Sequence, residues 1–311
     1  MIQARGLSKR YGSKLAVDQL SFTVRPGVVT GFLGPNGSGK STTMRMIMGL
    51  DLPSAGAATV NGKPYQELDW PLYEVGALLE AKAIHPGRSA RDHLRMLAES
   101  NCIPLRRIDE VLDLVGLSEV AGQRAGKFSL GMGQRLGIAA ALLGDPEVLL
   151  FDEPVNGLDP DGIRWARNLL RNLAHDGRTV FVSSHLMSEM ALTANEVIVI
   201  GRGRLIAEAS IEELTRRSAQ SFVTVRSRDH SALAAALERR GGRVVSEPDG
   251  SLSVRGIEAI DIGELAGELG VVLHELSPHA ASLEEAFMEL TDDSIEFRGE
   301  DTLAASQGAA R

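Results

Sequence analysis

The stretch "VVTGFLGPNGSGKST" at residues 28–42 decides the fold around it. It starts as a short apolar run typical of a buried strand, passes through a glycine-rich loop and continues into the helical pattern "KSTTMRMIMGL". The loop fits the Walker A pattern G-x-x-x-x-G-K-[ST], in which backbone N–H groups and a helix N-terminus surround phosphate oxygens. We expect Lys40 to reach the β- and γ-phosphates and Ser41 to hold Mg²⁺. The predicted nucleotide-binding residues of this loop are Gly34, Pro35, Asn36, Gly37, Ser38, Gly39, Lys40, Ser41 and Thr42.

Two further apolar runs end in polar side chains suited to phosphate chemistry. "EVLLFDEP" at 147–154 ends in Asp152 and Glu153, and "RTVFVSSH" at 178–185 ends in His185. Such runs, alternating with helical patterns, indicate parallel strands covered on both faces, and so the α/β class. We expect Asp152 to bind Mg²⁺ or its water, Glu153 to polarise a water for in-line attack on the γ-phosphate, and His185 to contact that phosphate. Taken singly, each of these strand ends has a purely structural alternative.

The composition narrows the class of protein. The 311 residues are 43% hydrophobic and 24% charged, which is typical of a soluble globular protein with room for two domains. We find neither an apolar run near the roughly 18 to 20 residues of a membrane-spanning helix nor a signal peptide. The net charge of −8 argues against a nucleic acid as partner, because such binding rests on Lys and Arg. The single cysteine, Cys102, forms no intramolecular disulfide and fits a cytoplasmic location.

A different pattern begins near residue 216. Strand, helix, hairpin, helix and strand follow one another in "SFVTVRS", "SALAAALERRG", "GRVVSEPDGSLSVRG", "DIGELAGELG" and "VVLHELS", and "SLEEAFMELT" reads as a final helix. The order β-α-β-β-α-β is typical of a small α+β ferredoxin-like domain, which we place at 216–291. Residues 292–311 are polar with few apolar anchors, so we expect a disordered tail.

A second turn of glycine and serine, in "KFSLGMGQRLGIAAALL" at 127–143, is left unexplained by a single phosphate site. Its core "FSLGMGQR" resembles the signature motif of the ATP-binding cassette (ABC) family, whose common form is LSGGQ. In that family two cassettes pack head to tail, and each signature closes over the nucleotide held by its partner. The resemblance implies that Ser129 and Gly131 contact γ-phosphate. Leu130 and Met132 depart from the common form, replacing the first glycine and the glutamine.

Other motifs occur in the order of the same family. Asp159 in "GLD" matches the D-loop, which implies a place at the dimer seam, and Tyr11 in "SKRYGSKLAV" matches the aromatic residue that stacks on adenine. The alternative for Tyr11 is a structural role as a half-buried tyrosine of a strand. Glu80 in "VGALLEAKAIHPG" stands where most cassettes have a glutamine that contacts Mg²⁺ or the attacking water. A glutamate there resembles the branch of bacitracin-, daunorubicin- and lantibiotic-type exporters, and implies a metal-binding and catalytic role. The alternative for Glu80 is that it is simply a solvated acidic residue of a loop.

The resemblance covers about residues 1–215 and implies a fold and a function. The fold is an ABC-type nucleotide-binding domain: a P-loop parallel-sheet core, antiparallel N-terminal strands and a helical subdomain at about 80–140. The function is ATP binding and hydrolysis, with Mg²⁺, by an exporter subunit on the inner face of the cell membrane. Its expected partners are a second ATP-binding subunit, forming a homodimer around two ATP, and a separately encoded transmembrane permease. The cargo would be a drug, antibiotic or peptide.

Three alternatives stay open at this point. A soluble ABC ATPase acting on ribosomes or DNA usually has two cassettes or a long coiled coil, neither of which the sequence contains. An importer subunit differs from an exporter subunit mainly in its membrane partner. A phosphate-loop switch protein outside the ABC family would leave the signature stretch without a role.

Overall fold

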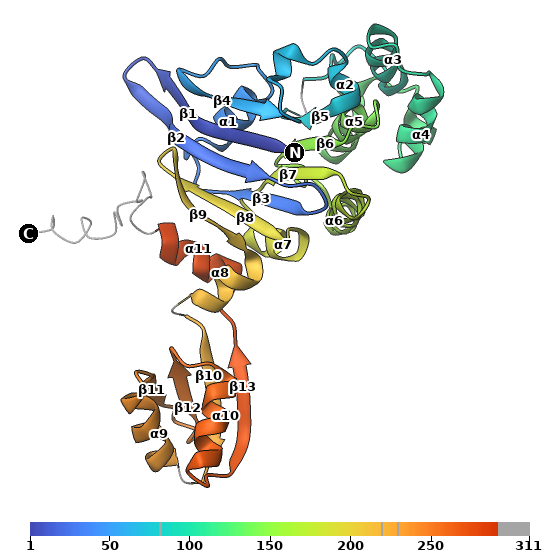
Figure 1. The fold of residues 1–311 in the computed structure, drawn as a ribbon. Helices are drawn as coiled ribbons and strands as arrows, with labels where there is room; N and C mark the ends of the chain where they lie inside the picture. The colour runs from blue at the N-terminus through green and yellow to red at the C-terminus, as the bar shows by residue number, and fades with distance from the viewer. Residues whose placement is uncertain (81–82, 219, 229, 292–311) are drawn as a thin grey trace, which may run out of the picture.

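The computed structural model describes residues 1–80, 83–218, 220–228 and 230–291. Residues 1–80 and 83–218 form a large α/β unit, which we call the cassette, and a small sheet with two helices lies apart from it (Figure 1). The predicted fold class is confirmed for both units. The tail expected at 292–311 lies outside the described residues. Across the described part of the chain, no helix combines the length and hydropathy needed to cross a bilayer.

A six-stranded sheet forms the centre of the cassette. Its strands, in spatial order, are β5 (Val75–Leu78), β6 (Val148–Asp152), β7 (Thr179–Ser183), β3 (Val29–Leu33), β8 (Glu196–Gly201) and β9 (Arg204–Ser210). The first five are parallel, and β9 is antiparallel to β8. Every residue of β3 and β7 is buried, as expected for parallel strands covered on both faces. The three apolar runs that the sequence singles out are therefore neighbours, and their carboxyl ends meet at one edge.

A three-stranded antiparallel sheet covers one face of the centre. In spatial order it contains β2 (Lys14–Val24), β1 (Ile2–Tyr11) and β4 (Ala55–Val60), which confirms the antiparallel N-terminal strands. Helix α1 (Lys40–Ile47) packs with this layer through Met44 and Ile47. The rings of Phe22, Phe32 and Phe181 join the two sheets, with centroids 4.9 to 5.7 Å apart. This core fixes the end of β3, where the phosphate loop begins.

Helices cover the opposite face and form a lobe beside it. They are α2 (Pro71–Glu74), α3 (Ala90–Ser100), α4 (Arg106–Leu114), α5 (Leu130–Leu142), α6 (Pro160–His175), α7 (Met187–Thr193) and α8 (Ile211–Arg217), with 3₁₀ turns at Tyr65–Glu67, Ser118–Val120 and Ala125–Lys127. The lobe of α3 and α4 packs on α5, which in turn packs on β5. Helices α3, α4 and α5 lie at about 80–140, where the sequence predicts a helical subdomain.

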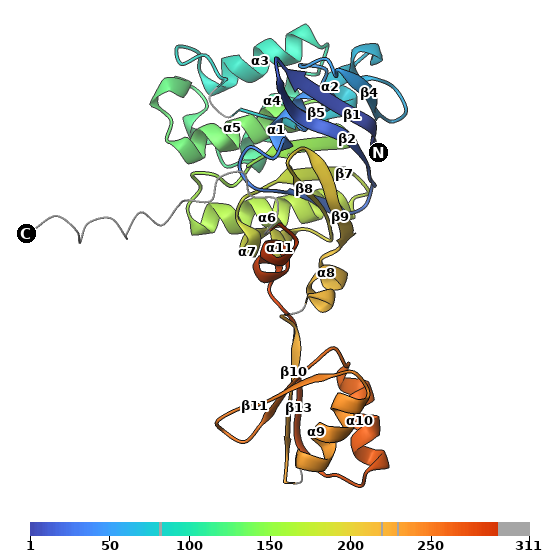
Figure 2. The same cartoon turned by 90° about the vertical axis from the view of Figure 1, so that its left-hand side faces the viewer.

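The small sheet has the ferredoxin-like topology that the sequence predicts. Its spatial order is β11 (Arg243–Ser246), β12 (Leu252–Arg255), β10 (Phe222–Ser227) and β13 (Leu273–His279), and all neighbours are antiparallel. Helices α9 (His230–Arg239) and α10 (Ala259–Glu268) pack on one face, as Figure 2 shows. Leu233, Leu237, Val254 and Ile262 form the centre of its own core.

The last helix, α11 (Leu283–Thr291), does not pack on the small sheet. It returns to the cassette and contacts α7 and α8 (Figure 1), where Leu283, Ala286 and Phe287 join the cassette core. The predicted accessory domain at 216–291 thus includes one helix with a different packing partner. The domain boundaries themselves stay a prediction.

Replacing Phe287 by alanine is expected to lower the free energy of unfolding of the cassette by about 3 kcal/mol, because it opens a cavity under α11. Phe287 is 7% exposed, whereas its neighbour Met288 is 52% exposed. The measurement is chemical denaturation of the full chain. Met288→Ala serves as the control and should change stability by less than about 0.5 kcal/mol. Equal losses in both variants would show that α11 is not docked.

Candidate active site

The phosphate loop joins the end of β3 to the start of α1, as the sequence predicts. Gly37 and Gly39 have φ angles of 79° and 105°, in the left-handed region that glycine adopts without strain. At Gly34, a Cβ atom would lie 2.5 Å from both the carbonyl oxygen of Ile200 and the Oγ of Ser38. Glycine at these positions keeps side chains out of the turn and lets the backbone approach a ligand closely.

Replacing Gly34 by alanine should weaken ATP binding by about tenfold or more, because the added methyl must displace the loop from Ile200 and Ser38. Nucleotide titration of the full chain measures the effect. Gly122→Ala is the matched control, since a Cβ there meets nothing within 4 Å. Wild-type affinity in Gly34→Ala would mean that the loop geometry is not needed for binding.

Lys40 lies inside this loop and is buried, with 8% exposure. Its Nζ donates hydrogen bonds to the carbonyl oxygens of Gly34, at 2.6 Å, and Pro35, at 3.2 Å. Burial lowers the pKa of Lys40, and the nearby carboxylates of Glu153 and Asp152 oppose that shift. The loop therefore holds a cation close to two acids that come from a different strand.

Those acids stand at the carboxyl end of β6, next to the end of β7. The hydroxyl of Ser183, on β7, donates to Asp152 Oδ1 and accepts a hydrogen bond from the Glu153 N–H at 3.0 Å. His185 Nδ1 lies 2.8 Å from Glu153 Oε2. Strand pairing thus brings together three side chains that the sequence places on two separate runs, as expected for the adjacent ends of parallel strands.

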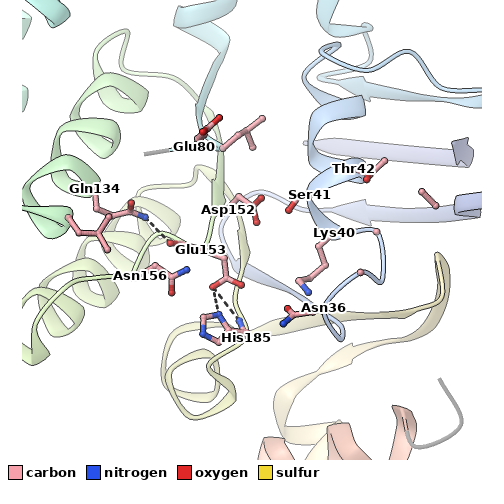
Figure 3. A pocket seen from close by; sticks show the side chains of 15 residues that line it. Asn36, Lys40, Ser41, Thr42, Glu80, Gln134, Asp152, Glu153, Asn156 and His185 are labelled. Carbon is pink, nitrogen blue, oxygen red and sulfur yellow. Dashed lines mark hydrogen bonds and ion pairs between the residues drawn. The ribbon is translucent and has the colours of Figure 1, made fainter. Parts of the chain in front are cut away.

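A cavity of about 720 Å³ lies between the phosphate loop and the carboxyl end of β6, where Asp152 and Glu153 stand. Figure 3 shows Lys40 and Ser41 on one side of it, facing Asp152 and Glu153, with Glu80 above. The predicted site residues that line it are Asn36, Gly37, Gly39, Lys40, Ser41, Thr42, Glu80, Asp152, Glu153 and His185. This space combines a cation, hydroxyls and carboxylates in the arrangement that phosphoryl transfer requires.

Ser129, Gly131 and Asp159 lie outside this cavity. Ser129 caps α5 by accepting a hydrogen bond from the Met132 N–H at 3.2 Å, and it lines a second cavity of about 370 Å³. Asp159 caps α6 through the Gly162 N–H at 2.8 Å. The structure does not bring these residues together with the phosphate loop of the same chain.

Tyr11 also lies outside the residues that line the cavity, at the end of β1. Its side chain is 47% exposed, and its hydroxyl donates to Asp51 Oδ2 at 3.0 Å. Desolvation and the Asp51 carboxylate raise the pKa of Tyr11. Lys9 Nζ lies 5.0 Å from the ring centroid. An exposed, hydrogen-bonded ring beside the loop helix is available for stacking on a base.

The donor set fits a nucleotide triphosphate with Mg²⁺. The Ser41 hydroxyl and the carboxylates of Asp152 and Glu80 line one cavity, and Mg²⁺ prefers oxygen ligands. Within the described residues there is no group of three His, Cys, Asp or Glu side chains placed to hold a metal, so phosphate oxygens would be needed as well. Ser38 Oγ is buried without a hydrogen-bond partner, which leaves a polar atom in the loop that phosphate would satisfy.

Three residues of the site were not predicted from the sequence. Gln134 donates from its Nε2 to the carbonyl oxygen of Glu153 at 2.7 Å, Ser183 holds both acids, and Asn156 lines the cavity. Ser183 stands two residues before His185 in "TVFVSSH", so its place on that strand was a usable signal. No local sequence pattern indicates the contact between Gln134 and Glu153, because these residues are 19 positions apart and belong to different elements.

The similarities to known proteins agree with this geometry. A family model described as "ABC transporter" matches residues 17–156, and one described as "Domain of unknown function (DUF8746)" matches residues 221–284. The bacitracin transport ATP-binding protein BcrA of Bacillus licheniformis is 41% identical over 221 residues, which cover 70% of this chain and 72% of that protein. The uncharacterized ABC transporter ATP-binding protein YhcH of Bacillus subtilis is 35% identical over 301 residues, covering 95% of this chain and 97% of that protein.

A solved structure described as the ATP-binding subunit of an ABC transporter is 25% identical, with a TM-score of 0.64, and covers 70% of this chain and 92% of that one. The fold and the site define an ATP-hydrolysing cassette, and the chain belongs to the ABC transporter family. Within the family, the identity to BcrA confirms the resemblance to the bacitracin-type branch. The alternative of a switch protein outside the family is excluded.

Proposed function

We propose that this chain is the ATP-binding and hydrolysing subunit of an exporter, and that two cassettes close around two ATP to drive transport through a separately encoded permease. The similarity to BcrA, a bacitracin transport ATP-binding protein, supports the transport assignment. A drug, an antibiotic or a peptide is the proposed cargo. The proposed location is the cytoplasmic face of the membrane, with the cassette bound peripherally.

Different residues around the cavity bind the phosphates, the adenine ring and the metal. The phosphate loop, with Lys40, binds the β- and γ-phosphates, and Tyr11 stacks on the adenine ring. Ser41, Asp152 and Glu80 would hold Mg²⁺, which would neutralise charge on the phosphates. The carboxylates of Glu153 and Asp152 favour the charged form of the buried Lys40, and this supports the division of roles.

Glu153 is the proposed general base. Its carboxylate orients a water for in-line attack on the γ-phosphate and accepts the proton. His185 holds that carboxylate, at 2.8 Å, and contacts the γ-phosphate from the rim of the cavity. Asp152 would remain a ligand of the metal. The Ser183 hydroxyl positions both acids, because it donates to the Asp152 carboxylate and accepts a hydrogen bond from the Glu153 N–H.

The signature turn supports a site shared between two copies. Ser129 and Gly131 lie at the start of α5, outside the phosphate-loop cavity of their own chain, and the side chain of Ser129 is exposed. In a head-to-tail pair, this helix N-terminus would face the γ-phosphate held by the other copy. Asp159, at the start of α6, would then lie along the seam between the cassettes.

The test is a detergent pull-down of the tagged chain from membranes of its native host, with partners identified by mass spectrometry. An untagged host strain provides the control. Recovery of a polytopic membrane protein in equal amount is the expected result, and that partner would define cargo and direction. The segment from Glu80 to about Leu97 is the proposed contact with it.

Recovery of ribosomal proteins or DNA instead would replace the transport assignment with that of a soluble ABC ATPase. Recovery of a permease together with an external binding protein would favour an importer. Neither outcome would affect the assignment of ATP hydrolysis, which rests on the residues of the cavity.

A further inference from the structure

The backbone of Glu153 is held in an unfavourable conformation. Its φ angle is +52°, in the left-handed region that residues with a Cβ seldom adopt. Such a conformation is energetically unfavourable and persists only where the surrounding structure enforces it. The strained residue is also the one whose carboxylate faces the phosphate loop across the cavity (Figure 3).

Two side chains hold the peptide groups of Glu153, one at its N–H and the other at its carbonyl oxygen. Ser183 Oγ accepts a hydrogen bond from the N–H at 3.0 Å. Gln134 Nε2 donates to the carbonyl oxygen at 2.7 Å, and the Asn156 N–H adds a longer bond of 3.2 Å to the same oxygen. Gln134 is 3% exposed, so its amide has little access to water as an alternative partner.

Gln134 belongs to the helix that begins with the signature turn. Helix α5 starts at Leu130, and Gln134 follows one turn later. The start of this helix fits tightly against the D-loop: a Cβ on Gly131 would lie 3.0 Å from the carbonyl oxygen of Gly157. A displacement of the signature turn therefore moves the Gln134 amide, because a hydrogen-bonded helix is stiff over one turn.

We propose that Gln134 is a positioning residue that fixes the Glu153 peptide in its left-handed conformation and couples the signature turn to the catalytic carboxylate of the same chain. This rests on the proposed role of Glu153 as general base. Closure of a second copy over the signature turn would then set the position of the base at the neighbouring site. Each cassette would sense, through α5, whether the partner's nucleotide is engaged.

The first test is Gln134→Leu, which keeps the volume and removes the amide. We expect kcat for ATP hydrolysis to fall about tenfold, with KM for ATP within about twofold of wild type, since the phosphate loop is untouched. ATP-dependent dimers, measured in the Glu153→Gln background, should still form. Gln123→Leu, a surface change of the same chemistry, is the control.

The second test is Gln134→Glu, in which a carboxylate oxygen faces the Glu153 carbonyl at neutral pH and repels it. On protonation the new carboxyl regains an O–H donor. Activity relative to wild type at the same pH should therefore rise as the pH falls from about 8 to about 6, while Gln134→Leu shows no recovery. Wild type in parallel corrects for Glu80, Asp152, Glu153, His185 and Lys40, which line the same cavity.

Wild-type kcat in Gln134→Leu would overturn the inference, and so would a loss of activity matched by loss of folded protein in thermal unfolding. Equal pH profiles for the two variants would show that the hydrogen bond is not the cause. The proposed function fails differently: if Glu153→Gln hydrolyses ATP at the wild-type rate, the base itself is misassigned, whatever Gln134 does.

Discussion

Replacing Glu153 by glutamine lowers kcat for ATP hydrolysis by about 10³-fold and leaves the Kd for ATP within about threefold of wild type. The substitution keeps the shape of the side chain and a hydrogen-bond acceptor for His185, and it removes the carboxylate that accepts a proton from the attacking water. The phosphate loop, which provides the binding contacts, is unchanged. Steady-state phosphate release at saturating ATP measures the first quantity, and titration with a fluorescent ATP analogue measures the second.

Glu147→Gln is the matched control for this change. Glu147 is exposed and stands just before β6, whereas Glu153 directly follows the other end of that strand. The same chemical substitution there should leave kcat within about twofold of wild type. Turnover at the wild-type rate in Glu153→Gln would remove Glu153 from the role of base and would direct attention to Asp152 or Glu80.

The parts of the site that the sequence predicts well are those whose chemistry is local. The phosphate loop lies within nine consecutive residues, and the strand before it and the helix after it are encoded by adjacent patterns. The closeness of Asp152 and Glu153 to His185 was predictable because parallel strands bring their carboxyl ends to one side of a sheet. The ferredoxin-like order was likewise predictable, since each strand and helix there has its own period.

Contacts between distant elements were beyond the reach of sequence patterns. Nothing near Gln134 in the chain indicates that its amide meets the backbone of Glu153, because that contact depends on how α5 packs on β5, the strand paired with β6. The docking of α11 was also beyond sequence patterns. Its apolar face predicts a buried helix, but the sequence does not say whether that face packs on the cassette core or on the core of the small sheet. The bond from Tyr11 to Asp51 spans 40 residues and is set by the layer of β1 over α1.

Replacing Ser129 by arginine should abolish ATP-dependent dimers while the monomer binds ATP with wild-type affinity. The large cationic side chain fills the space at the start of α5 where a second copy is proposed to approach, and it cannot be buried there without losing its hydration. The substitution leaves the phosphate loop of the same chain unchanged, and Ser129 does not line the cavity beside that loop, although its neighbour Leu130 does. Size-exclusion chromatography with light scattering, in the Glu153→Gln background, measures the dimer fraction with and without ATP.

Two controls separate the dimer contact from the helix cap. Ser129 accepts a hydrogen bond from the Met132 N–H, so its replacement by arginine or alanine removes a cap and costs about 1 kcal/mol of stability. Ser129→Ala removes that cap without adding bulk and should retain most of the dimer, whereas Ser118→Arg adds the same charge at another exposed position of the helical lobe and should retain all of it. Intact dimers in Ser129→Arg would exclude the signature turn from the partner's site, and they would also remove the signal that Gln134 is proposed to transmit.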